Sequence, residues 1–137
     1  MSDQACPECG ALGCREKFDA MMALEFESPT VFGAVHHITV LCYNLQHPSN
    51  FSEEALAWMH TSLRSVMIDG MSAATLRKYA AKIPKDVKIK RPESRSVDAK
   101  KITWSMTVAD IRTENPAEYT EDAKKWALSI LKDLKLN

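Results

Sequence analysis

The 137-residue chain is the size of one ordinary domain and can bury a hydrophobic core without disulfides. Its 45% hydrophobic and 26% charged residues exclude a disordered chain, and 18 basic against 18 acidic residues predict no polyanionic partner from net charge. No apolar run approaches the roughly 20 residues that span a bilayer, and the first residues lack the pattern of a signal peptide. We therefore expect a cytoplasmic protein with no membrane partner, whose four cysteines are thiols or metal ligands.

The first half of the chain predicts helices separated by proline. Apolar residues recur at helical spacing over residues 14–27, which predicts the first helix. Ser28 can then cap a second helix and Pro29 suits its first position. This second helix is expected to continue to about Gln46, because the residue before Pro48 is disfavoured in helical conformation.

Three further helices are predicted downstream. Ser52 starts one that Gly70 can cap, and Ser72 opens a shorter one that must stop before Pro84. The terminal helix has the clearest periodicity, with apolar residues at helical spacing over residues 123–134. All of these segments predict a mainly α protein.

The stretch from Asp86 to Met106 differs in pattern from the helices. Its segments DVKIKR and KKITWSM alternate apolar and polar residues, which indicates a short two-stranded β-ribbon, and a helical turn is expected over residues 107–111. The expected fold is a small helical bundle with an N-terminal zinc-knuckle loop and this ribbon before the C-terminal helix. A single domain, 1–137, would comprise a metal knuckle (1–13), a helical core (14–82), the ribbon (83–106) and a C-terminal helical segment (107–137).

The clearest chemical motif is CPECG at residues 6–10. Two residues between Cys6 and Cys9 let both thiolates converge on one ion, and Gly10 permits the tight turn that aims backbone amides at sulfur. A CxxC pair also fits a thioredoxin-type redox site, but that pair begins a helix, whereas GALG follows here. The motif therefore favours a metal knuckle, with Zn2+ as the cofactor.

Two further ligands are needed to complete a tetrahedral site. Cys14 is the first candidate, since a helix start favours a thiolate. If the first two helices form an antiparallel hairpin, Cys14 lies opposite the end of the second helix, where His47 is found. His36 is the alternative fourth ligand, but about 16 Å of helix separates it from His47, so both cannot bind one ion. Cys42 lies on the apolar stripe and is expected to be a buried hydrophobic residue.

A second polar cluster is expected in the middle of the bundle. The same hairpin geometry brings Glu25, His36, Tyr43 and His60 toward one pocket. We expect a buried, mutually hydrogen-bonded network there, because no nucleophile or oxyanion site accompanies it. The alternative is a catalytic pocket in which these groups are the acid and base. His37 lies off the apolar stripe and is expected to face solvent or a helix contact.

Basic residues accumulate between Lys82 and Lys101, where there are eight against three acidic ones. A basic ribbon that includes Trp104 could bind nucleic acid through phosphate contacts and base stacking. A solvated sheet edge protected by lysines is the commoner meaning of such a pattern. Nucleic acid therefore stays a secondary expectation for the partner.

Several segments resemble an uncharacterised bacterial family, a domain of unknown function with an N-terminal CPxCG and a VHxxTVxxYxxQHP motif. The corresponding segments here are CPECGA, LEFESP, VHHITVLCYNLQHP, TVADI and Trp126-Ala127. Matching positions are Cys6, Cys9, Cys14, His36, Tyr43, Gln46, His47 and Pro48. The resemblance implies a metal site and gives no reaction.

Three functional hypotheses follow. The first is a zinc-binding helical protein whose metal is structural and which acts as a binding or regulatory module for an unknown protein or small-molecule partner. The second is a small enzyme that uses a pocket of Glu25, His36 and His60, with or without a metal. The third is a redox sensor that ejects its metal when the thiols oxidise. Whether the protein is an enzyme stays open.

Overall fold

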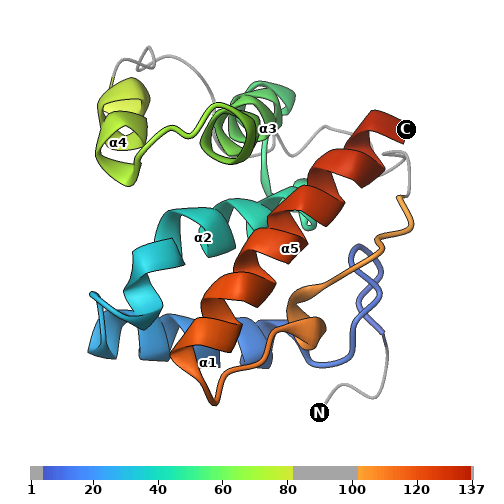
Figure 1. Cartoon of the computed structure of the whole chain (residues 1–137). Helices are drawn as coiled ribbons and strands as arrows, with labels where there is room; N and C mark the ends of the chain where they lie inside the picture. Colours follow the sequence, from blue (N-terminus) through green and yellow to red (C-terminus); the bar gives the residue numbers. More distant parts are fainter. Residues whose placement is uncertain (1–4, 82–101, 137) are drawn as a thin grey trace.

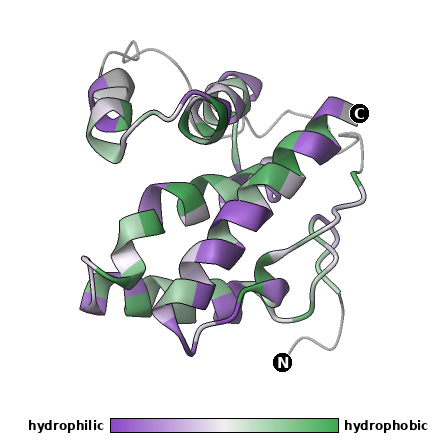
Figure 2. Ribbon diagram, viewed as in Figure 1, coloured by the Kyte–Doolittle hydropathy of each residue, from purple (hydrophilic) through white to green (hydrophobic). Residues whose placement is uncertain are grey.

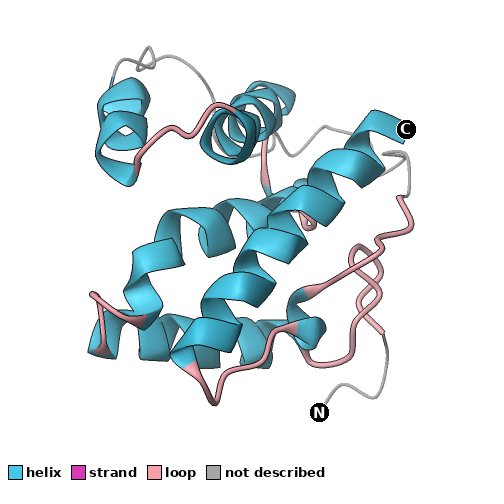
Figure 3. Ribbon diagram, viewed as in Figure 1, coloured by secondary structure: helices cyan, strands magenta, loops and turns pink. Residues whose placement is uncertain are grey.

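The computed structural model describes residues 5–81 and 102–136. Within these ranges the chain forms helices and loops and contains no strand (Figure 3). The elements are α1 (Cys14–Glu27), η1 (Phe32–Val35), α2 (His36–Leu45), η2 (Pro48–Asn50), α3 (Glu53–Ile68), α4 (Ala73–Ala81), η3 (Val108–Asp110) and α5 (Pro116–Leu136). The predicted mainly helical fold is confirmed, and none of the described helices is long and apolar enough to cross a membrane.

Helices α2, α3 and α5 pack against one another and enclose the core, while α1 packs against α2 and α4 packs against α3 (Figure 1). The N-terminal loop, residues 5–13, lies beside the segment that leads into η3 (Figure 1). The largest fully buried side chains come from elements throughout the fold: Trp126, Tyr119, Met21, Leu63, Ile111 and Ile130. The core therefore joins α5 to the helices of the first half of the chain.

Helix α5 shows how amphipathic periodicity builds this core. Hydrophobic and hydrophilic residues alternate around it (Figure 2), and Tyr119, Trp126 and Ile130 on its inner side are completely buried. The Trp126 indole Nε1 donates to Gln46 Oε1 over 3.1 Å, and Gln46 Nε2 donates to the Met106 carbonyl over 2.8 Å. Gln46 therefore fixes the end of α2 against α5 and against the chain that leads into η3.

The second helix begins later than the sequence predicted. Ser28 and Pro29 do not start it; the Ser28 amide donates to the Leu24 carbonyl and ends α1. The chain turns, passes through η1 and enters α2 at His36. Gly33 in η1 lies close to α1, because a Cβ atom there would lie 2.7 Å from the Glu25 carbonyl oxygen. The turn between the two helices therefore needs a residue without a side chain at this position.

Most of the predicted β-ribbon, residues 83–106, lies outside the described residues, as does the basic stretch between Lys82 and Lys101. Its described end, residues 102–106, runs as a loop. Asp133 on α5 fixes this loop by accepting hydrogen bonds from the Ser105 amide (2.8 Å) and hydroxyl (2.7 Å). The predicted helical turn at 107–111 is confirmed as η3, which begins with a capping box of Thr107 and Asp110.

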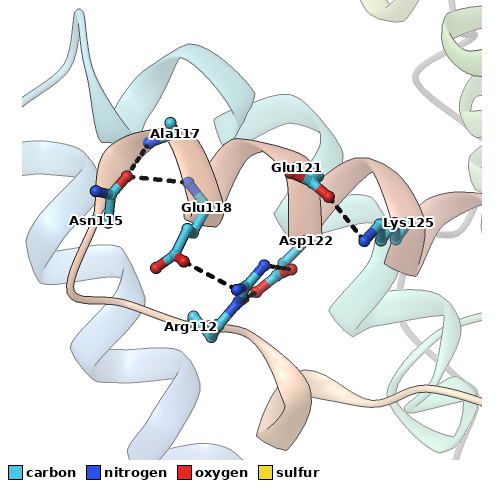
Figure 4. Close-up of polar contacts among 7 residues, drawn as sticks. All are labelled: Arg112, Asn115, Ala117, Glu118, Glu121, Asp122 and Lys125. Atoms are coloured by element: carbon cyan, nitrogen blue, oxygen red, sulfur yellow. Dashed lines mark hydrogen bonds and ion pairs between the residues drawn. The ribbon is translucent and has the colours of Figure 1, made fainter.

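The connection from η3 to α5 is held by polar contacts (Figure 4). The Arg112 guanidinium donates twice to Asp122, over 2.9 Å each, and once to Glu118 over 3.0 Å. Asn115 accepts hydrogen bonds from the first amides of α5 and caps the helix, which begins at Pro116. These contacts fix the direction in which α5 enters the bundle.

Candidate metal centre and polar cavity

The CPECG segment folds into a tight loop closed by its own backbone. The Cys6 amide donates to the Ala11 carbonyl and the Gly10 amide to the Cys6 carbonyl, each over 2.9 Å. Gly10 has a φ of 85°, a left-handed conformation that glycine adopts without strain. The Cys9 amide lies 3.5 Å from Cys6 Sγ and donates to it. The predicted tight turn is therefore present, with a backbone amide aimed at sulfur.

Three elements bring the candidate ligands together. Cys6 and Cys9 come from this loop, Cys14 from the first residue of α1, and His47 from the turn after α2. The ligand atoms of these four side chains all lie within 4.8 Å of one another. The group is therefore close enough to bind one metal ion.

Each ring nitrogen of His47 has a different neighbour. Nδ1 lies 2.7 Å from the Tyr43 carbonyl oxygen, which fixes Nδ1 as the donor. Nε2 is then the free acceptor, and it lies 3.5 Å from Cys14 Sγ. The Tyr43 ring stacks on His47 at a centroid distance of 4.1 Å and on Phe18 at 3.9 Å. His47 therefore points Nε2 at the thiols, supported as metal-binding histidines usually are.

Outer contacts tie the knuckle to the rest of the protein. The Glu8 carboxylate accepts hydrogen bonds from the Ser49 amide (2.8 Å) and hydroxyl (2.9 Å), just beyond His47. On the other side, the Trp104 indole donates to the Glu8 carbonyl over 3.1 Å. Glu8, between the two knuckle cysteines, thus anchors the loop both to η2 and to residues 102–106.

The thiols of the cluster differ in how readily they ionise. Burial raises the pKa of Cys9 to about 12, and the neighbouring charges of Cys6 and Cys14 act in the same direction. Burial likewise raises the pKa of Cys14. Burial also opposes ionisation of Cys6, but hydrogen bonds from the amides of Cys9 and Glu8 hold its pKa below the ordinary value. Ionising all three of these thiols together would therefore need a nearby cation to offset their mutual repulsion.

His36 and Cys42 lie outside the metal cluster. His36 is the first residue of α2, at the opposite end of the helix from His47. Cys42 is completely buried in the hydrophobic core, and burial raises its pKa well above the ordinary value. The alternative fourth ligand is therefore not near the three cysteines, and Cys42 occupies the core position expected for it.

The second polar cluster centres on Glu25, whose side chain is completely buried. His36 Nδ1 lies 2.6 Å from Glu25 Oε1. The hydroxyls of Thr39 (2.7 Å) and Tyr119 both donate to Glu25 Oε2. Burial raises the pKa of Tyr119, and its bond to Glu25 adds to the effect. Three donors thus satisfy one buried carboxylate.

The structure unites only part of the predicted mid-bundle pocket. Glu25 and His36 meet, but Tyr43 stacks on His47 at the metal centre. His60 is half-buried on α3, close enough to Arg64 for that charge, together with burial, to lower its pKa. Thr39 and Tyr119 are the partners that sequence reasoning missed. Thr39 lies three residues from His36 on one helix face and could have been found by spacing.

Glu25 and His36 line a cavity of about 710 Å³. His36 contributes a side chain that is 39% exposed. His37 also lines this cavity, and burial, followed by the charges of His36 and Arg77, lowers its pKa. The network is therefore buried at Glu25 but reaches an open cavity through His36. The expectation of a fully buried network therefore holds for Glu25 and is wrong for His36.

Comparison with known proteins gives a family but no described relative. The model of a family of unknown function, DUF5946, matches residues 4–135. Comparisons with curated proteins and with solved structures found no match.

Proposed function

Because the chain belongs to DUF5946, a family of unknown function, we propose a function from its own geometry: a zinc-binding helical module whose metal is structural. The ion would join the N-terminal loop to the start of α1 and to the end of α2. The module would then present its helical surface or its cavity to a protein or small-molecule partner.

The observation that supports this proposal is the close grouping of the four ligand atoms. Tetrahedral zinc, with sulfur at about 2.3 Å and nitrogen at about 2.1 Å, separates two such ligands by about 3.6 Å. Cys14 Sγ and His47 Nε2 are 3.5 Å apart. Three thiolates and one imidazole fill all four positions of such an ion, which is typical of a structural site.

Zinc content and cooperative melting test this proposal together. Protein purified without added metal should contain about one zinc per chain, release it when the thiols are modified, and then lose its cooperative thermal transition. Cys42→Ser, outside the cluster, is the control and should retain zinc. Metal-free protein that melts cooperatively while all its thiols are reactive would overturn the proposal.

A small enzyme is the second candidate, and one contact favours it. Glu25 orients Nδ1 of His36, as carboxylates do in acid–base pairs, while His36 lines a cavity. Nε2 of His36 is then the nitrogen that could take up a proton. Chromogenic esters and amides provide a first screen. An enzyme would be supported if the protein turns over a substrate and His36→Gln abolishes this turnover without loss of zinc or a change in melting. Turnover that is unchanged in His36→Gln would exclude this site.

A further inference from the structure

The cavity beside His36 combines apolar walls with one guanidinium, that of Arg77. Its walls come from α2, α3 and α4 and include Val40, Leu41, Met59 and Leu76. Its volume, about 710 Å³, is within the range of sites that bind small molecules, roughly 300–1,000 Å³. The walls therefore favour an occupant with an apolar body.

The charged side chains among the described lining of the cavity are Arg77 and Glu25. Both oxygens of Glu25 already accept hydrogen bonds, from His36 on one side and from Thr39 and Tyr119 on the other. Within residues 5–81 and 102–136, Arg77 forms no ion pair with a carboxylate. Its guanidinium therefore stays available to an anion.

We propose that this cavity binds a small apolar carboxylate, whose acid group pairs with Arg77 and whose hydrocarbon body lies against Val40, Leu41 and Leu76. A guanidinium suits this role because it can donate two parallel hydrogen bonds to one carboxylate. The inference rests on the proposed role as a binding module for a small molecule, but it does not depend on the zinc.

The surface next to His36 supports the same class of ligand. Phe26 lines the cavity yet is 71% exposed, and its ring centroid lies 5.2 Å from that of His36. An exposed aromatic ring beside an apolar cavity offers further contact to a hydrocarbon chain. An amine ligand, by contrast, would meet Arg77 and find no unoccupied carboxylate oxygen at Glu25.

Displacement of a fluorescent probe tests the proposal. Anilinonaphthalene sulfonate, an aromatic anion, should gain fluorescence on binding, and octanoate should displace it at much lower concentration than octanol or octylamine. Arg77→Ala should weaken octanoate binding about tenfold or more, the usual effect of losing a charge-assisted hydrogen bond. Arg64→Ala, which removes the same charge from α3 outside the cavity lining, is the matched control and should change binding less than about twofold.

Two further measurements make the result decisive. Ala34→Trp places a bulky ring at an exposed residue of the cavity lining and should block both probe and octanoate. Equal displacement by octanoate, octanol and octylamine, or equal effects of Arg77→Ala and Arg64→Ala, would overturn the proposal. Zinc content measured on the same samples separates the two hypotheses: zinc without octanoate binding refutes only the cavity ligand, and octanoate binding without zinc refutes only the structural metal.

Discussion

The two ends of α2 carry histidines in opposite surroundings. His47, just beyond the last residue of the helix, is only 6% exposed and faces three thiols. His36, the first residue of the helix, has a side chain that is 39% exposed and lines a cavity. Both hold Nδ1 in a short hydrogen bond, to the Tyr43 carbonyl for His47 and to the Glu25 carboxylate for His36. One helix thus positions two imidazoles in different surroundings.

The difference lies in what surrounds the remaining nitrogen. At His47, Nε2 lies within 4.8 Å of three thiol sulfurs, so the site suits a fully coordinated ion. At His36, the buried neighbour is a carboxylate whose oxygens are already occupied, so the ring can act only toward the cavity. A histidine with a fixed tautomer is therefore a ligand or an acid–base group according to its other neighbours.

Replacing each of the two histidines by alanine, in separate variants, tests this comparison most strongly. His47→Ala should remove one of four ligands and lower zinc affinity by several orders of magnitude, with loss of cooperative melting, because structural zinc contributes about 10–16 kcal/mol in small zinc domains. His36→Ala should retain about one zinc per chain. Zinc titration with a competing chelator measures both. Equal loss of zinc in the two variants would show that the ends of α2 are not independent.

Glu25→Gln should lower the free energy of unfolding but leave the zinc content unchanged. The amide offers one acceptor oxygen in place of two and carries no charge, so the hydrogen bonds that Glu25 receives in this buried site become weaker or are lost. The expected cost is about 1–3 kcal/mol in the free energy of unfolding, measured in urea. Thr39→Ser, which keeps the hydroxyl, is the matched control and should cost less. A Glu25→Gln variant as stable as the original protein would mean that the network contributes nothing to folding.

Glu8→Ala should weaken the metal centre from outside it. The variant loses the carboxylate that receives the Ser49 amide and hydroxyl, so the knuckle is less firmly placed against the turn after His47. Loss of such supporting contacts typically lowers metal affinity about tenfold or more. Glu16→Ala, an exposed acidic residue in the first turn of α1, removes the same charge and should leave affinity unchanged. Equal effects would indicate that charge alone, and not the Ser49 contacts, explains the loss.

Local patterns predicted much of this structure. The bounds of α1 and α3 follow from apolar spacing and, for α3, from Ser52, whose hydroxyl does cap the helix. The hairpin argument brought Cys14 near His47 although the start of α2 was misplaced, because it depended only on the antiparallel direction and on the end of the helix. Metal binding by the group stays a prediction.

What sequence reasoning missed depends on tertiary packing. Tyr119 meets Glu25 across 94 residues of chain, and no local spacing indicates that contact. Hairpin geometry placed His60 near His36, but η2 lies between α2 and α3 and lengthens that connection. Gly33 is a further case, since its need for a small residue arises only from the nearby backbone of α1.

The smallest expected effect concerns neither end of α2 but the ion pair of Arg112 and Asp122, which fixes the start of α5. The Arg112 guanidinium holds the pKa of Asp122 below its ordinary value. The ionised pair therefore stabilises the fold fully at pH values above 3.8, the unfolded-state pKa. This stabilisation is lost as the pH falls through the lower pKa of the folded state. Asp122→Asn should cost about 1 kcal/mol, because the Arg112 side chain is half exposed. The difference in the free energy of unfolding between the variant and the original protein, measured in urea, should be the same at about pH 7 and about pH 5. Acid also weakens zinc binding, but it does so equally in both proteins and does not change this difference. Glu121→Gln, whose partner Lys125 is exposed, should produce no measurable change. A difference that already closes by pH 5 would mean that Asp122 is protonated there, with a folded pKa above its ordinary value, and that Arg112 does not anchor α5 through its charge.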